Sequence, residues 1–199
     1  MAMFIGRNRK ARVTYGFDEI ALVPGQVTIN PNEVDIAFGI PAKDKDPLKL
    51  AIPILASAMD GVVDVRFAIE MGKLGGLAVL NLEGIQTRYK NPEEVLLKVL
   101  EAEKESVTGL LQKIYQEPVQ EDLIAARIKE IKDSGVVAAV SSIPQKAEHY
   151  GHIAQEAGVD VFVVQSTVST VRHVSTEYRS LNLARLCKDL RCPIIVGNT

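Results

Sequence analysis

Polar residues come directly after five apolar stretches of the chain, and their types suit ligand binding more than reaction chemistry. Neutral hydrogen-bonding groups dominate this set, whereas strong acids, bases and metal ligands are few. If the apolar stretches are parallel strands, their carboxyl ends meet at one edge and the polar residues converge there. The set consists of Ser57, Met59 and Asp60, then Asn81 and Glu83, Ser141 and Ser142, Gln165, Ser166 and Thr167, and finally Asn198 and Thr199. Ser, Thr and Asn are also common helix caps, so only this convergence favours a ligand site over ordinary turns.

The histidines and cysteines do not predict a metal site. His149 and His152 lie three residues apart on one face of an expected helix, but no further ligand follows in zinc-binding spacing. His173 follows the fourth apolar stretch and is a candidate for ligand contact. Cys187 and Cys192 also lack metal-ligand spacing, and we interpret them as reduced packing residues.

A recurring unit organises most of the chain. An amphipathic helical stretch ends at a break and is followed by a short, largely apolar run of the kind found in strands buried on both faces. The helix and strand pairs are 66–76 with 77–81, 122–135 with 136–142, 145–158 with 159–165, and 181–191 with 193–197. Another apolar run, at 50–57, precedes the first helix. Five strands separated by helices predict a parallel sheet built from β/α crossovers.

Two architectures fit this pattern, an open doubly wound sheet and a closed barrel. The turn after the first strand, at 57–64, reads Ser-Ala-Met-Asp-Gly-Val-Val-Asp and lacks the Gly-x-Gly-x-x-Gly of dinucleotide-binding open sheets. We therefore expect an α/β protein of the (β/α)8 TIM-barrel class. A whole barrel needs about 250 residues. We expect this chain to hold the N-terminal arm and about the first five β/α units.

Two segments lie outside the repeat. Residues 1–50 are expected to form an N-terminal arm and a hairpin that covers the closed end of the barrel, and 51–199 to hold strands one to five. In the second segment, Asn91 followed by Pro92 and two acidic residues is a typical helix start. One helix is expected to run to about Tyr115, and another to begin near 117–118.

Composition favours small-molecule partners. The 23 Lys and Arg residues against 25 Asp and Glu give a net charge of −2, so no global charge attracts nucleic acid or a membrane surface. Trp is absent, which removes the strongest stacking platform for single-stranded nucleic acid. No apolar stretch reaches the roughly 18 residues of a membrane span, and no signal-peptide pattern is present. We expect a soluble, cytoplasmic protein.

Residues 53–63, Pro-Ile-Leu-Ala-Ser-Ala-Met-Asp-Gly-Val-Val, closely resemble the first barrel strand and loop of IMP dehydrogenases and GMP reductases. Residues 16–24 are similar to the Thr-Phe-Asp-Asp-Val-Leu-Leu-Val-Pro segment near the start of that family's domain, and 68–76 resemble its first helix. Residues 195–198 are similar to the Ala-Gly-Asn that closes its fifth strand. The resemblance covers most of the chain in order.

The resemblance implies a function and a set of site residues. Ser57 and Met59 match positions that touch the purine nucleotide, and Asn198 matches the asparagine that faces substrate and nicotinamide. The family's catalytic cysteine follows the sixth strand, so we expect it beyond Thr199 and expect these residues alone to be inactive. The resemblance implies NAD-dependent oxidation of IMP to XMP in guanine nucleotide synthesis, by a homotetramer. A monovalent cation such as K⁺ is a further expectation for the full-length protein.

Two departures from the family pattern leave alternatives open. The family's Asp-Ser-Ser or Asp-Ser-Ala after the fourth strand, which helps place the dinucleotide, is Gln165-Ser166-Thr167 here, so a charged acceptor becomes a neutral one. The segment between Asn81 and Val136 is too short for the CBS regulatory domain of most IMP dehydrogenases, so the chain resembles the related group without it. The alternatives are a GMP reductase and a purine-nucleotide-binding barrel without catalysis.

Overall fold

The computed structural model describes residues 4–7, 9–43, 46–167, 174, 176 and 179–197. The chain divides into two compact units, 1–35 and 36–199. In the first unit, β1 (Phe4–Ile5) pairs antiparallel with β2 (Arg9–Lys10), and two short 3₁₀ helices follow, η1 (Phe17–Glu19) and η2 (Pro31–Glu33). The Asn30 side chain caps η2 by accepting a hydrogen bond from the Asn32 N–H.

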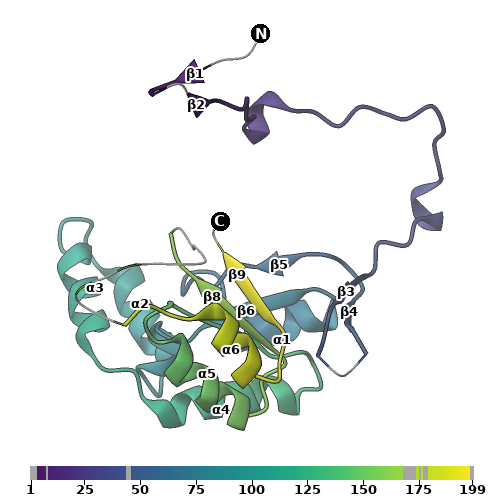
Figure 1. Ribbon diagram of the computed structural model, residues 1–199. Coiled ribbons are helices and arrows are strands. Elements are labelled where there is room, and N and C mark those ends of the chain that lie inside the picture. Colours follow the sequence, from purple (N-terminus) through teal and green to yellow (C-terminus); the bar gives the residue numbers. More distant parts are fainter. Residues whose placement is uncertain are drawn as a thin grey trace. The chain divides into compact units, whose positions relative to one another are not determined.

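The second unit is built on a five-stranded parallel sheet (Figure 1). Its strands are β5 (Leu55–Ala56), β6 (Leu77–Asn81), β7 (Ala139–Ser142), β8 (Val161–Gln165) and β9 (Ile194–Gly197). They pair strictly in chain order, with no switch in strand order, and the helices α1, α4, α5 and α6 cover one face. An open doubly wound sheet reverses its strand order and carries helices on both faces. The fold is therefore α/β with a curled parallel sheet, a half-barrel.

At least one helix lies between each two consecutive strands of the sheet, as the recurring sequence pattern predicts. The helices are α1 (Val65–Lys73), η3 (Ile85–Thr87), α2 (Pro92–Glu101), α3 (Val107–Gln116), α4 (Glu121–Asp133), α5 (Ala147–Glu156) and α6 (Leu183–Asp189). Asp64 caps α1 by accepting from the Phe67 N–H at 2.6 Å. After α1, α4 and α5 the chain turns through Gly75, Gly135 and Gly158, whose φ angles of 89°, 81° and 85° suit glycine.

The strands bury both faces, and alternate residues serve two different cores. Ala78, Leu80, Val140 and Phe162 pack against the helices. The residues between them, Leu77, Val79, Ala139 and Val161, form a second cluster on the inner face of the curled sheet. Ile40 and Leu50 join this inner cluster from the antiparallel hairpin of β3 (Phe38–Ile40) and β4 (Leu48–Leu50). The hairpin thus packs near the amino ends of the strands and leaves the carboxyl ends accessible.

Two sequence expectations are wrong in detail. The helix expected over 91–115 is two helices, because Ala102 is extended and the Ser106 backbone N–H and hydroxyl both bond the Glu103 carbonyl in a turn between α2 and α3. The first strand, expected over 50–57, is only β5. Leu50 pairs with Phe38 in the hairpin instead, and Pro53 has no N–H for a strand ladder.

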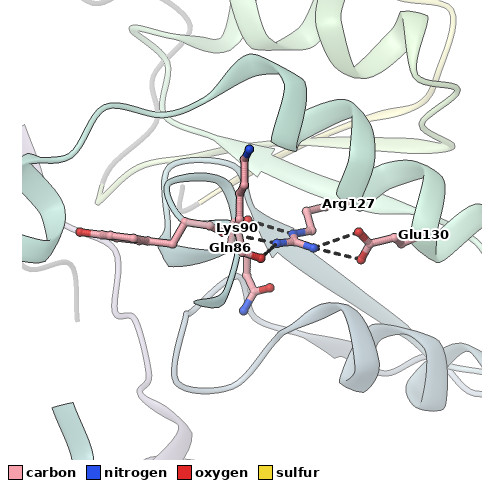
Figure 2. Close-up of polar contacts among 5 residues, drawn as sticks. Gln86, Lys90, Arg127 and Glu130 are labelled. Carbon is pink, nitrogen blue, oxygen red and sulfur yellow. Dashed lines mark hydrogen bonds and ion pairs between the residues drawn. The ribbon is translucent and has the colours of Figure 1, made fainter. Parts of the chain in front are cut away.

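Arg127 on α4 fixes the segment that follows β6. Its side chain is only 12 % exposed and donates to the carbonyls of Gln86 (3.0 Å) and Lys90 (2.8 Å), while Glu130 binds it at 2.9 Å (Figure 2). A guanidinium presents several donors in a fixed plane and is well suited to gather backbone carbonyls. Arg127 therefore ties the turn after η3 to the helix layer. No helix in the described part of the chain is long and apolar enough to cross a membrane.

We expect Arg127→Met to lower the free energy of unfolding by about 2–4 kcal/mol, because the Gln86 and Lys90 carbonyls lose a charged donor whose own side chain is largely buried. Urea denaturation at neutral pH measures the change. Arg185→Met is the matched control, since Arg185 lies 58 % exposed beside Asp189 and solvent screens that pair. The control should cost no more than about 0.5 kcal/mol. An equally small loss for both variants would show that Arg127 has no bracing role.

Candidate functional site

A cavity of about 390 Å³ opens at the carboxyl ends of β6, β7 and β8. Asn81, Ser141 and Gln165 continue the inner-face alternation of these strands, and the register sets Asn81 opposite Ser141. The lining consists of Ala58, Asn81, Glu83, Ser141, Ser142, Ile143, Gln165, Ser166 and Thr167. This is the edge at which the sequence predicts convergence of polar residues. The lining offers neutral hydrogen-bonding groups and a single carboxylate, Glu83.

Glu83 is held by one hydrogen bond at its backbone and one at its side chain. Its N–H donates to Asn81 Oδ1 at 3.0 Å, and its Oε2 accepts from the Ile143 N–H at 2.9 Å. The loops after β6 and β7 are thereby joined through one side chain. Burial raises the pKa of Glu83, because the charged carboxylate loses water, while the Ile143 N–H and then Arg88 act in the opposite direction. The arrangement presents a fixed hydrogen-bond acceptor to the cavity.

The loop after β5 lies beside this cavity. Ala58 is buried and lines the cavity, whereas its neighbours Ser57 and Met59 are exposed, Met59 by 50 %. Asp60 turns away into the protein and accepts hydrogen bonds from the Ile85 N–H at 3.0 Å and from the Tyr115 hydroxyl. The expected substrate positions, Ser57 and Met59, are not among the lining residues, although both adjoin Ala58 in the chain.

The remaining sequence candidates fall into three groups. Gln165, Ser166 and Thr167 line the cavity together. Asn198, Thr199 and His173 lie outside the described residues. His149 and His152 are exposed on α5, where His149 pairs with Glu121 at 2.7 Å, away from the cavity lining.

The interpretation of both cysteines as packing residues is wrong for Cys187 and fits Cys192, which packs against the core. Cys187 is exposed on α6, and Cys192 precedes β9. Both thiols are free, and burial raises the pKa of the Cys192 thiol, which disfavours the nucleophilic thiolate.

A larger hollow of about 730 Å³ lies outside the barrel mouth, between α1, α2 and α4. Its lining carries charges of both signs, including Arg66, Lys73, Glu70 and Glu94. Arg127 is part of it, but its donors are engaged by backbone carbonyls and Glu130 (Figure 2). The smaller cavity is the better candidate for the functional site because it lies at the carboxyl ends of the strands.

The sequence matches the IMP dehydrogenase / GMP reductase domain over residues 14–199. The chain belongs to the IMP dehydrogenase / GMP reductase family. A crystal structure of an IMP dehydrogenase/GMP reductase-like protein from Corynebacterium glutamicum superimposes with a TM-score of 0.85 and 32 % identity, covering 99 % of this chain and 52 % of that one. The family resemblance expected from residues 53–63 is thus confirmed.

The names of the curated relatives support a less specific activity than the resemblance implies. Uncharacterized oxidoreductases of Mycobacterium tuberculosis and Mycobacterium leprae are each 34 % identical over 97 % of this chain and 52 % of theirs. An inosine-5'-monophosphate dehydrogenase of Methanocaldococcus jannaschii is 30 % identical over 54 % of this chain and 22 % of its own length. The chain spans about half the length of the oxidoreductases it matches. The names of these relatives are oxidoreductase and, over a shorter match, inosine-5'-monophosphate dehydrogenase.

Two features of the site were not assigned from sequence. Ile143 contributes the backbone N–H that fixes Glu83, and a backbone donor has no residue-type signature. Tyr115 contacts Asp60 although 55 residues separate them. The signal that could have suggested a close approach is Gly84, where a side chain would overlap Asp60.

We expect Glu83→Gln to stabilise the protein more at about pH 7 than at about pH 4. The pKa of Glu83 is raised above its ordinary 4.5, so the folded state holds the proton more tightly than the unfolded chain. The associated stability is complete below pH 4.5 and is lost as pH rises through the raised pKa, and glutamine removes that loss. Thermal unfolding midpoints of wild type and variant across this range measure the effect. Glu156→Gln, at an exposed position on α5, is the control. A Glu83→Gln advantage that shrank as pH rose would contradict the assignment.

Proposed function

We propose that the full-length protein is an NAD-dependent oxidoreductase that converts IMP to XMP. The observation that carries the proposal is the polar cavity at the carboxyl ends of β6 to β8 in a chain of the IMP dehydrogenase / GMP reductase family. Oxidation at purine C2 adds a water oxygen and transfers a hydride to NAD, so XMP, NADH and a proton are formed. The half-barrel is completed to a (β/α)8 barrel by the remainder of the full-length chain.

In this proposal the described residues bind and orient the ligands. Ser57 and Met59 adjoin the cavity where the purine nucleotide binds. For Asn198, which lies outside the described residues, the contact with substrate is proposed from the family resemblance alone. Gln165, Ser166 and Thr167 contact the dinucleotide. A neutral lining with one carboxylate suits a nucleoside, because Glu83 can accept hydrogen bonds from ribose hydroxyls while the amide and hydroxyl groups match the base. NAD, when bound, supplies the hydride acceptor.

The rest of the proposal follows the family. The active protein is a cytoplasmic homotetramer, and K⁺ supports turnover in the full-length chain. Its partners are small molecules, with no role for nucleic acid or membrane. The net charge of −2 supports this choice of partners, because it creates no general attraction to polyanions.

The direct test is turnover by the full-length protein with two substrate pairs. We expect NADH to form from IMP and NAD, and no reaction with GMP and NADPH, with nucleotide products resolved by chromatography. Turnover only with GMP and NADPH would overturn the proposal in favour of a GMP reductase. Tight binding of IMP without turnover of either pair would overturn it in favour of a nucleotide-binding barrel, for which the neutral Gln165 offers some support.

We expect Ser57→Ala to raise the KM for IMP about fivefold with little change in kcat, since one ground-state hydrogen bond is lost. Steady-state kinetics of the full-length enzyme measure both constants. Ser134→Ala is the matched control, because the Ser134 hydroxyl bonds the Ile131 carbonyl at the end of α4, away from the cavity. An unchanged KM in Ser57→Ala would remove Ser57 from the proposed nucleotide site.

A further inference from the structure

The carboxylate of Asp60 joins three segments that are distant in sequence. Asp60 belongs to the loop between β5 and α1, and its Oδ2 accepts from the backbone N–H of Ile85, the first residue of η3, at 3.0 Å. The same oxygen accepts from the hydroxyl of Tyr115 near the end of α3. The β5 loop, η3 and α3 are therefore held at one point.

Gly84 makes this junction possible. It occupies the N-cap position of η3 but provides no side-chain cap, so Asp60 caps the helix from the other loop. A Cβ at position 84 would lie 1.8 Å from Asp60 Oδ1, which is too close for any side chain. That oxygen is buried and has no hydrogen-bond partner in the described part of the chain. Among the described residues, the carboxylate therefore has two donors, Ile85 N–H and Tyr115 O–H.

The loop that carries Asp60 is braced by its own backbone hydrogen bonds. The Met59 N–H donates to the Ser57 carbonyl at 2.8 Å, and the Met59 carbonyl accepts from the N–H groups of Val62 and Val63 at 2.9 Å. Val63 is buried in the core between the sheet and the helices. A displacement of Asp60 would therefore change the position of Ser57 and Met59.

Tyr115 is the part of this junction that comes from outside the sheet core. Its helix, α3, packs with α2 and η3 in a small cluster around Ile85, Val95 and Ile114 that is separate from the sheet core. Burial, followed by the Asp60 carboxylate, raises the pKa of Tyr115, so its hydroxyl stays a donor at neutral pH. Tyr115 thus connects the α2–α3 pair to the loop beside the cavity.

We propose that Tyr115 and Asp60 are positioning residues that hold the loop of residues 57–63 in the shape that receives the nucleotide, which makes the α2–α3 pair part of the binding machinery. This inference rests on the proposed nucleotide site for its ligand. The hydrogen-bonded junction at Asp60 supplies the mechanism. Loss of the Tyr115 hydroxyl leaves the carboxylate with one donor, and the loop then samples other positions.

The test compares Tyr115→Phe with Tyr89→Phe in the full-length protein. The Tyr89 hydroxyl donates to the Ile114 carbonyl at 3.0 Å, so its removal also costs α3 one hydrogen bond but does not touch Asp60. Calorimetric titration should show IMP affinity about fivefold weaker or more in Tyr115→Phe and unchanged in Tyr89→Phe. In turnover, Tyr115→Phe should raise the KM for IMP and leave kcat nearly unchanged. Equal affinity in Tyr115→Phe and wild type, or an equal loss in both variants, would overturn the inference.

A ligand-free measurement separates this inference from the proposed function. Hydrogen exchange at the amides of residues 59–63 should be about fivefold faster in Tyr115→Phe than in wild type or Tyr89→Phe. If wild type fails to bind IMP but exchange is still faster in Tyr115→Phe than in wild type, the proposed function fails and the junction stands. If wild type binds IMP and the exchange rates do not differ, the junction fails and the proposed function stands.

Discussion

The parallel pairing of β5 to β9 in chain order is the constraint on which the candidate site depends. Each strand of such a sheet delivers the residue after its last apolar position to the same edge. Side chains alternate between the two faces of the sheet along each strand, and this alternation decides which of those residues point to the inner face. Asn81, Ser141 and Gln165 share the cavity because they follow Val79, Ala139 and Val163 on the inner face. A one-residue change of register would turn these polar groups toward the helices.

Carboxylates that accept backbone N–H groups from another segment hold the loops in place around this sheet. Glu83 receives the Ile143 N–H between the loops after β6 and β7, and Asp60 receives the Ile85 N–H between the loops after β5 and β6. At the opposite edge, Asp160 accepts the Ala138 N–H at 2.8 Å and pairs with Lys132. Loops tied in this way can position a ligand without a metal or a disulfide.

The sequence predicted the parts of the fold that depend on local pattern. The apolar run at 77–81 forms β6 with the expected bounds, because a buried parallel strand has a continuous apolar signature. Glycine after a helical pattern correctly marked the ends of α1, α4 and α5. The division of the expected 91–115 helix was missed, since residues 102–106 contain no Gly or Pro to mark a turn.

Only the site residues that directly follow the strands could be predicted from the sequence. Convergence of Gln165 to Thr167 with Asn81 and Glu83 follows from strand order, and the structure confirms that they line one cavity. The contacts of Asp60 with Tyr115 and of Glu83 with Ile143 were not predictable, because they join residues 55 and 60 positions apart through loop conformation. Such long-range contacts leave no periodic signal in the sequence.

A crystal structure of the full-length protein with IMP and NAD tests the central claim most directly. The account predicts the purine beside Ser57 and Met59, and a ribose hydroxyl within hydrogen-bond distance of the Glu83 carboxylate. Electron density for the nucleotide in the hollow between α1, α2 and α4, or anywhere other than the carboxyl ends of the strands, would contradict it.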